Sequence, residues 1–217
     1  MKTVKIFVLV LMMVCCFGSM SLAQKELPFM GSITTELTEE ASIFILPGGA
    51  GPLLSEAMYF GGQLANARIE LVVVDVEWNP FVNFSHEDIW LAPETSTHLV
   101  CPGGPWSHFD ADVDTNVDGE TYFENPLNGG GWTEGPIWVY LLGDQAATPE
   151  GVDFPPLPLR FNSADINADG VVGLSDLGQF ATDFFGEYQY RSDFLWDGVL
   201  NLSDVGMLAF GMGAACE

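Results

Sequence analysis

The stretch Asp165–Leu177, with the sequence DINADGVVGLSDL, says most about the fold of the last quarter of the chain. Acidic or amide side chains occupy every second position at its start, Gly170 follows, and Asp176 stands at the twelfth position. A second stretch, DFLWDGVLNLSDV, begins at Asp193 and aligns with the first without a gap, 28 residues further on (193 minus 165). Such an internal repeat predicts two copies of one structural unit that pack together.

Each copy continues into a segment with helical periodicity. Apolar residues recur at positions i, i+3, i+4 and i+7, which places them on one face of a helix. These residues are Leu177, Phe180, Ala181 and Phe184 in the first copy and Val205, Leu208, Ala209 and Met212 in the second. We therefore predict a loop followed by a short amphipathic helix in each copy. We expect the two helices to bury their apolar faces against each other.

The spacing of oxygen-bearing residues in the first copy matches a calcium loop. Calcium takes roughly six to eight oxygen ligands, and such a loop supplies them from positions 1, 3, 5, 7, 9 and 12, with glycine at position 6 for the sharp turn. The matching ligands are Asp165, Asn167, Asp169, the carbonyl of Val171 and Asp176, and a water can serve at position 9, where Gly173 stands. This match predicts bound calcium. The alternative is a plain polar loop between two apolar segments.

The second copy offers a less complete set of ligands. They are Asp193, Asp197, the carbonyl of Val199, Asn201 and Asp204, with Gly198 at the turn. Leu195 stands at the third position and cannot bind a cation, so calcium should bind more weakly here, by about an order of magnitude or more, unless the backbone or a water substitutes. The alternative is a degenerate loop that is kept for its hairpin shape.

The repeat resembles the type I dockerin module, in which a calcium loop and one following helix occur twice and an Asp closes each loop. The resemblance implies calcium-dependent folding and a cohesin-like partner, through which dockerins attach secreted proteins, often polysaccharide-degrading enzymes, to scaffolds. The tenth and eleventh loop positions contact the cohesin and are often Ser-Thr in dockerins. Here they are Leu174 with Ser175 and Leu202 with Ser203, and neither helix carries Lys or Arg, where many dockerins have basic contacts.

From Ser32 to about Leu159 the sequence shows the signals of strands. Short apolar runs such as SIFIL, IELVVV, DIWLAP and PIWVYLL are separated by clusters of Gly, Pro, Asn and Asp. About seven such strands predict an immunoglobulin-like β-sandwich. The segments IELVVVDVEWNPF and DTNVDGETYF resemble secreted bacterial Ig-like domains of the invasin type, and that resemblance implies a structural or adhesive role. The matching residues are Asp75, Asn79, Pro80, Asp114, Gly119 and Phe123.

The predicted organisation has three parts and is mainly β. A signal peptide (residues 1–23) precedes an Ig-like β-sandwich (24–158) and a small all-α, dockerin-like calcium-binding repeat module (159–217). Lys2 and Lys5 precede an apolar run that is shorter than the roughly 20 residues of a membrane anchor, the alternative interpretation. We therefore expect a secreted bacterial protein, extracellular or at the cell surface, with no membrane segment after cleavage.

Two further expectations concern how the parts are joined. Cleavage after Ala23 leaves Cys101 and Cys216, which would most simply pair in an oxidising compartment. The alternatives are two free thiols or intermolecular bridges. The linker PPLPLRF is short and stiffened by prolines, so we expect the C-terminal module to pack on the Ig-like domain. If that domain covers Leu174 and Leu202, the face that dockerins use for cohesins is unavailable.

The charge of the chain excludes one class of partner. The chain has 6 basic and 30 acidic residues and a formal net charge of −24. Loss of two lysines with the signal peptide would leave −26 (4 minus 30). So acidic a chain repels phosphate backbones and anionic membrane surfaces, which argues against nucleic acid as a partner and favours cations.

Motifs for catalysis are missing, so we predict a non-catalytic protein. One hypothesis is a secreted, calcium-stabilised structural or adhesive protein that contacts a cell-surface partner. The other is a carbohydrate-binding accessory of an extracellular polysaccharide-degrading system, in which Trp106 and Trp132, both in glycine-rich loops, stack on sugar rings. Ordinary packing is the alternative role for both tryptophans. A third acidic stretch, around Asn116 and Asp118, matches a calcium loop only at its start and is interpreted as a hairpin turn.

Overall fold

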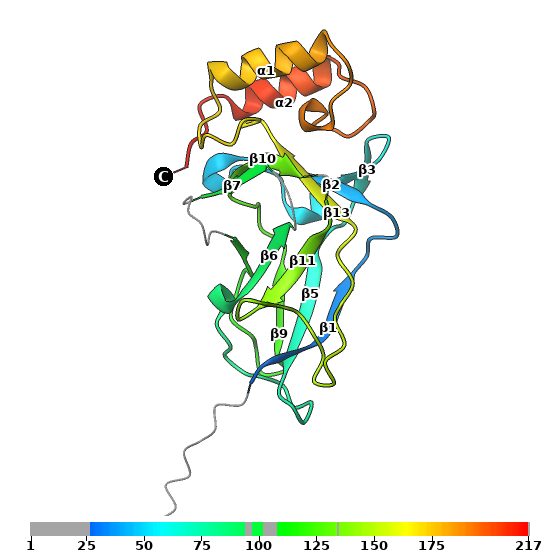
Figure 1. The fold of residues 1–217 in the computed structure, drawn as a ribbon, viewed down its shortest axis with the longest axis vertical. Coiled ribbons are helices and arrows are strands. Elements are labelled where there is room, and N and C mark those ends of the chain that lie inside the picture. The colour runs from blue at the N-terminus through cyan, green and yellow to red at the C-terminus, as the bar shows by residue number, and fades with distance from the viewer. Residues whose placement is uncertain (1–26, 94–96, 102–107, 134, 217) are drawn as a thin grey trace, which may run out of the picture.

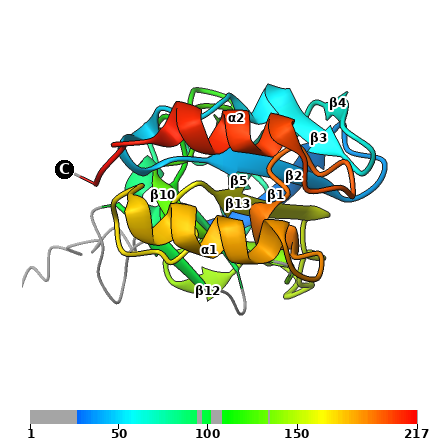
Figure 2. The ribbon, with the colours of Figure 1, turned by 90° about the horizontal axis from the view of Figure 1, so that it is seen from above.

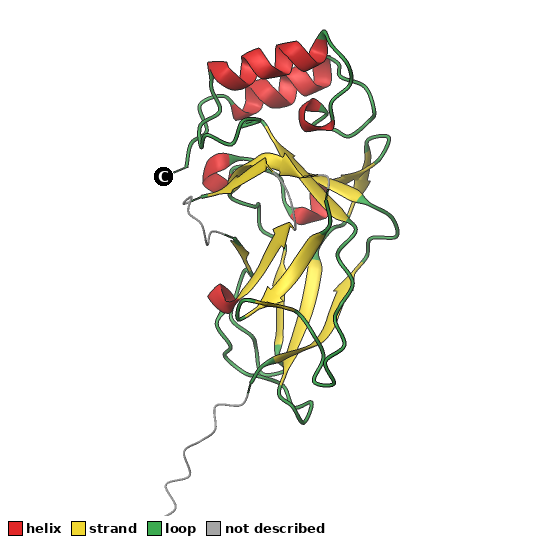
Figure 3. Cartoon of the chain, in the orientation of Figure 1, coloured by secondary structure: helices red, strands yellow, loops and turns green. Residues whose placement is uncertain are grey.

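The computed structural model describes residues 27–93, 97–101, 108–133 and 135–216, which form three β-sheets followed by two helices (Figures 1 and 3). The mainly β character and the two C-terminal helices are confirmed. The immunoglobulin-like sandwich is not confirmed, because the described strands form three sheets where that fold has two. The predicted signal peptide lies outside the described residues.

The central sheet has six strands and lies between the helices and the other two sheets (Figure 1). In spatial order its strands are β4 (Gln63–Ala65), β3 (Ala57–Tyr59), β2 (Ala41–Ile45), β13 (Leu159–Ser163), β10 (Gly129–Thr133) and β7 (Thr97–Val100). Neighbouring strands are antiparallel except β2 and β13, which run parallel with Phe161 opposite Ile43. Residues 159–163, which we expected to belong to the C-terminal module, therefore form an inner strand of this sheet.

The other two sheets are wholly antiparallel. One contains β1 (Phe29–Thr35), β5 (Ile69–Val74) and β9 (Glu120–Phe123), in that order. The other contains β12 (Asp144–Gln145), β11 (Ile137–Leu141), β6 (Ile89–Pro93) and β8 (Phe109–Asp110). Four short 3-10 helices join the strands and helices: η1 (Pro47–Gly49), η2 (Leu54–Glu56), η3 (His86–Asp88) and η4 (Tyr190–Ser192).

The main hydrophobic core is enclosed by the three sheets, and the side-chain alternation of the strands explains it. In β11, Ile137, Val139 and Leu141 are buried while the residues between them are half-buried, as expected for a strand with one face on a core. By contrast, all five residues of β2 are buried. Ile43 belongs to the main core, whereas Phe44 belongs to a second core beneath the helices. β2 is thus buried on both faces.

Helices α1 (Leu174–Phe184) and α2 (Leu202–Gly211) run side by side over the outer face of the central sheet (Figures 1 and 2). Phe180 of α1 and Leu208 of α2 are buried in the second core with Phe44 and Leu46 of the β2 segment. Burial of a phenylalanine or leucine side chain contributes about 1.5–3 kcal/mol. The two helices therefore bury Phe180 and Leu208 in one core that they share with the sheet.

The residues that each helix buries, which we call its buried line, differ from the predicted row of apolar residues at i, i+3, i+4 and i+7. In α2 the buried line is Asp204, Leu208 and Gly211, while Val205, Ala209 and Met212 are exposed. A β-carbon on Gly211 would lie 2.7 Å from Leu46 Cδ2 and 2.8 Å from Ala164 Cβ, so glycine lets the end of α2 approach the sheet closely. The equivalent buried residues of α1 are Asp176, Phe180 and Asp183. Each helix thus turns an aspartate inward, toward its own loop.

Cys101 and Cys216 form a disulfide with their Cα atoms 5.2 Å apart, which confirms the predicted pairing. The bond joins the end of β7 to the segment that follows α2. Disulfides are typical of oxidising compartments such as the extracellular space. Among the residues that the structure describes, none of the helices has the length and apolar character needed to cross a bilayer.

Candidate metal centre

The first loop follows β13 directly, and its first residue, Asp165, is fully buried. The chain then turns sharply, with Ala168 and Gly170 in the left-handed region at φ 57° and 88°. This turn directs two backbone amides at the buried carboxylate: Asp169 N donates to Asp165 Oδ1 at 3.1 Å and Gly170 N donates to Oδ2 at 3.0 Å. The glycine at position 6 is required because other residues rarely adopt this conformation.

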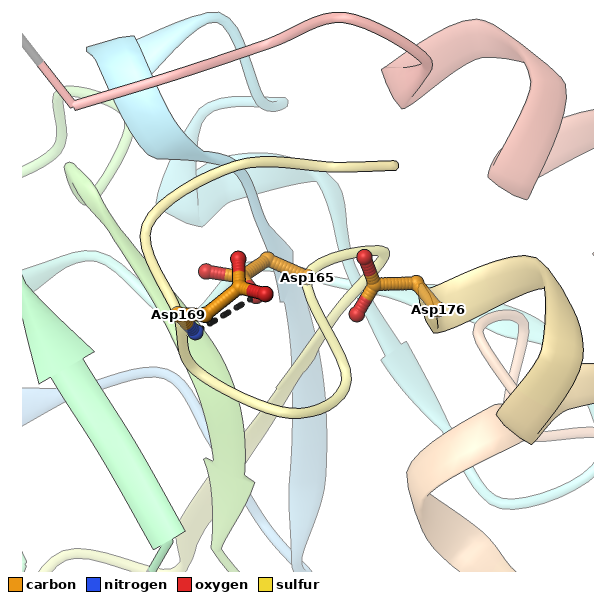
Figure 4. Close-up of side chains that lie close together, drawn as sticks. All are labelled: Asp165, Asp169 and Asp176. Carbon is orange, nitrogen blue, oxygen red and sulfur yellow. Dashed lines mark hydrogen bonds between the residues drawn. The ribbon is translucent and has the colours of Figure 1, made fainter. Parts of the chain in front are cut away.

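Three carboxylates converge within this loop (Figure 4). Asp165, Asp169 and Asp176 each offer an oxygen, and these oxygens all lie within 4.8 Å of one another. Asp165 and Asp176 are buried and Asp169 is exposed. Burial raises the pKa of Asp165, and repulsion from the other two carboxylates adds to this, against the lowering effect of the two amides. A buried group of like charges is costly without a cation, so this group could hold a metal ion.

Further hydrogen bonds hold the cluster in shape. Asp176 Oδ2 accepts from Gly173 N at 2.9 Å and its Oδ1 accepts from Asn167 N at 3.2 Å, so this carboxylate closes the loop and caps α1. Asp169 N donates to Asn167 Oδ1 at 2.9 Å. All side-chain donors of the set are oxygens, which suits a hard cation such as calcium better than zinc or copper. Of the predicted ligands of the first loop, Asp165, Asp169 and Asp176 are thus brought together.

The first loop packs against the glycine-rich strand β10, and this role of the strand was not predicted from the sequence. A β-carbon on Gly130 would lie 2.7 Å from Cγ of Asp165, so no larger residue fits there. Gly131 N donates to the carbonyl of Asp165 at 2.6 Å. The signal that could have revealed this role is the run Gly129–Gly131 itself, since successive glycines in a strand mark a close approach of another chain segment.

The second loop has the same backbone path but a weaker cluster. Trp196 and Gly198 are left-handed, at φ 48° and 85°, at positions equivalent to those of the first loop. Asp193 Oδ1 and Oδ2 accept from Asp197 N at 3.1 Å and Gly198 N at 2.9 Å. The oxygens of Asp193, Asp197 and Asp204 do not form a group as close as that of the first loop within the described residues.

The remaining interactions of the second loop explain this difference. Tyr188 donates its hydroxyl to Asp193 Oδ2 at 2.8 Å and so occupies part of the carboxylate. Asn201 Oδ1 accepts from Ser203 N at 2.7 Å, which caps α2. Burial raises the pKa of both Asp193 and Asp204. Val199 and its counterpart Val171, whose carbonyls are predicted ligands, are exposed residues.

The sheet also fixes the position of the second loop. Asn162 of β13 is fully buried and donates its Nδ2 to the carbonyl of Asp193 at 2.7 Å. Phe60, in the turn between β3 and β4, packs edge-on against Trp196 with ring centroids 5.8 Å apart. The guanidinium of Arg160 lies 4.9 Å from the centroid of the Trp196 ring. The first residue of each loop is thus bonded through its carbonyl to a strand of the central sheet.

Three other features singled out in the sequence are the third acidic stretch and the two tryptophans of the glycine-rich segments. The third acidic stretch forms a turn, with Gly119 N donating to Asn116 O at 3.0 Å and Asp118 N to Asn116 Oδ1 at 2.8 Å. Trp132 is half-buried in strand β10, so its expected position in a loop is wrong, because the glycines before it pair with β7. Trp106 lies outside the described residues.

The outer face of the C-terminal segment is open. Leu174 and Leu202, at the tenth position of the two loops, are each 80% exposed. The β-domain therefore does not cover them, although the segment does pack on that domain. The reason is that each helix turns its buried line toward the sheet and its first residue away from it.

Comparison of the chain with known protein families, curated proteins and solved structures found no match.

Proposed function

We propose that this is a secreted, non-catalytic bacterial protein in which calcium holds a dockerin-like loop and helix repeat against a β-domain with a structural or adhesive role. The observation that carries the proposal is the convergence of Asp165, Asp169 and Asp176 between the central sheet and α1. Calcium would supply the positive charge that these carboxylates need, since two of the three are buried, and the carbonyl of Val171 would complete the ligands of the turn. The disulfide supports an extracellular location.

The proposed role of calcium is to stabilise the fold. Without a cation, repulsion among the three carboxylates opposes the turn that places α1 on the sheet. Binding to the folded form alone stabilises it by RT ln(1 + [Ca]/Kd), about 2.7 kcal/mol at a hundredfold excess over Kd. This is a large share of the stability of an ordinary domain.

Thermal unfolding in calcium and in chelator tests the proposal. We expect calcium to raise the melting temperature of the unaltered protein, Asp165→Ala to abolish most of that rise, and Asp193→Ala to abolish less of it. Asp118→Ala is the matched control, since it removes one exposed aspartate from the turn between β8 and β9. An equal calcium effect in Asp165→Ala and Asp118→Ala would contradict the proposal.

A second candidate function is attachment to a scaffold. It is favoured by the exposure of Leu174 and Leu202, which present the same apolar side chain at equivalent positions of the two repeats. A cohesin-like protein is the partner that the dockerin resemblance implies. A cohesin pull-down in calcium tests it: capture that is lost in the double variant Leu174→Asp, Leu202→Asp would support it, and no capture of the unaltered protein would contradict it.

The carbohydrate-binding alternative has a separate test. Trp132 lies half-buried in β10, and a tryptophan face is a good surface for a sugar ring. Affinity electrophoresis in a panel of neutral polysaccharides should show retardation that Trp132→Ala abolishes, if this alternative holds. Migration unchanged by every polysaccharide would contradict it.

A further inference from the structure

The segment Met212–Cys216, which we call the C-terminal tail, runs alongside the first loop. Gly213 N donates to the carbonyl of Val172 at 3.0 Å, and Val172 N donates to the carbonyl of Ala214 at 2.9 Å. Cys216 N donates to the carbonyl of Gly170 at 2.9 Å. Val171 and Ala215 form an antiparallel bridge between the two segments. The tail thus pairs as a short strand with positions 6 to 8 of the first loop.

These loop positions determine the shape of the acidic cluster. Gly170 is the left-handed residue of the turn, and its amide donates to Oδ2 of Asp165. Val171 N donates to Oδ1 of Asp169 at 3.1 Å. The same short stretch therefore bonds to the tail through one set of backbone groups and to two of the three carboxylates through another. A shift of the tail would move both amides relative to those carboxylates.

The disulfide joins the tail to the end of β7, the strand that pairs with β10. Cys216 is bonded to Cys101, and Cys101 N donates to the carbonyl of Asn128 at 3.0 Å. Asn128 directly precedes β10, whose Gly130 lies against the Asp165 carboxylate. The loop therefore contacts both β10 and the tail, and the disulfide links the tail to β7, the neighbour of β10 in the sheet.

The second loop offers an internal comparison. Its turn residue Gly198 is covered by the ring of Phe60, and Trp196 O accepts from Gly61 N at 2.9 Å. These contacts come from the β3–β4 hairpin, which the disulfide does not join. The two loops have the same backbone turn but pack against different segments of the chain. A change at the disulfide should therefore affect the first loop and leave the second unaltered.

We propose that the Cys101–Cys216 disulfide controls the first cation loop: the oxidised form keeps the tail paired with Gly170–Val172, and reduction releases the tail and weakens cation binding there. The chemical step is ordinary exchange with a dithiol reductant. The sulfur–sulfur bond of the protein breaks, two electrons and two protons pass to the cysteines, and the reductant becomes a disulfide. The statement about cation affinity rests on the proposed function, whereas the statement about tail pairing does not.

Thermodynamic linkage makes the effect reciprocal. If reduction weakens calcium binding by some factor, calcium must make the disulfide harder to reduce by the same factor. Couplings between two sites typically lie between about 5-fold and 150-fold. We expect a factor of about tenfold, because the tail orients amides that hold the carboxylates and does not itself supply a carboxylate ligand.

Hydrogen exchange and calcium titration of the full chain test the proposal together. The samples are the oxidised protein, the protein reduced by a dithiol, and the double variant Cys101→Ser, Cys216→Ser. In chelator, we expect exchange of the Val172 amide to accelerate by about tenfold or more in the last two samples. The Gly198 amide of the second loop is the matched control and should keep its rate, and the Val73 amide of β5 reports that the β-domain remains folded.

The outcomes separate the two proposals. Equal protection of the Val172 amide in oxidised and reduced protein would contradict the proposal that the disulfide controls the first loop. If calcium binds at the first loop, the same calcium Kd in oxidised and reduced protein would also contradict it. Faster exchange at Val172 without calcium binding to any sample would support the pairing of the tail and contradict the proposed function alone. Faster exchange at Gly198 and Val73 as well would show general unfolding on reduction and would also overturn a specific effect on the first loop.

Discussion

The substitution Gly130→Ala should weaken cation binding at the first loop, although Gly130 offers no ligand. A β-carbon at this position would overlap Oδ2 of Asp165 and lie 2.7 Å from its Cγ and 3.0 Å from its Cβ. Ordinary van der Waals contact begins at 3.4 Å, so the carboxyl carbon must retreat by at least about 0.7 Å (3.4 minus 2.7) or β10 must shift by a similar amount. Calcium tolerates a range of only about 0.3 Å in its distances to oxygen. Asp165 would therefore leave the ligand geometry that it shares with Asp169 and Asp176.

We expect the calcium Kd of Gly130→Ala to rise by about tenfold or more, the effect of losing one charged ligand. Overpacking should also lower the free energy of unfolding by about 1–3 kcal/mol. Isothermal titration calorimetry measures the first quantity and urea unfolding in chelator the second. Gly178→Ala is the matched control: it lies in α1 with open space around it, so the same change should leave Kd unaltered and stabilise the helix by up to about 1 kcal/mol. Wild-type calcium affinity in Gly130→Ala would refute the reasoning.

Three further predictions follow from the same contacts. Asp183→Asn should cost about 2–3 kcal/mol in urea unfolding, because Asp183 is buried and accepts two bonds from Arg191 at 2.8 Å. Burial alone would raise the pKa of Asp183, but these bonds outweigh burial and lower the pKa. The ionised carboxylate therefore stabilises the fold at pH values above the ordinary pKa of an aspartate, and the cost of the substitution should shrink as pH falls through the lowered pKa. A pH-independent cost would contradict this. Calcium affinity should fall by about tenfold per pH unit below the raised pKa of Asp165, since the ion must then displace a proton, and calorimetric titrations with a flat pH profile would contradict it. In the cation-free protein the raised pKa of Asp165 has the opposite effect on stability: the free energy of unfolding falls as pH rises through that pKa. Asn162→Ala should lower the free energy of unfolding by about 1–3 kcal/mol, because the carbonyl of Asp193 loses its donor at 2.7 Å and keeps only the longer bond from Trp196 N at 3.3 Å. A variant as stable as the wild type would contradict this.

The local elements at the C-terminus could be predicted from the sequence because their signals are local. The turn glycine Gly170, the closing Asp176 and the apolar positions of α1 all lie within twenty residues of one another. The cysteine pairing was also predictable, although the separation of 115 residues gives no local signal, because the compartment and the count of cysteines left one simple pairing.

The face that each helix turns to the sheet could not be predicted from hydrophobicity. The buried line of α2 contains Asp204, because this carboxylate accepts from Phe194 N at 2.9 Å and from Asn201 N at 2.9 Å within its own loop. It also contains Gly211, because β2 approaches there. Periodicity counts apolar side chains and misses a buried residue whose role is to bond a loop or to leave room for a neighbour.

The sheet arrangement depended on contacts between distant segments. Residues 159–163 form β13 between β2 and β10, although Leu159–Phe161 end the stretch PPLPLRF, which its prolines predict to be a linker, and the whole range lies in the predicted C-terminal module. The parallel pairing with β2 joins segments more than a hundred residues apart, and a short strand carries no sign of its partner. Likewise, Gly129–Gly131 predict a loop by composition but form a strand, because the lack of side chains admits Asp165.

A crystal structure of the protein grown in saturating calcium tests the central claim most directly. The account predicts an ion within the first loop, bound by carboxylate oxygens of Asp165, Asp169 and Asp176 at about 2.3–2.6 Å, the range for calcium in proteins. It also predicts that the Asp165 carboxylate still lies against Gly130. An ordered water at this position under saturating calcium, or an ion held elsewhere while the three carboxylates stay apart, would contradict the account.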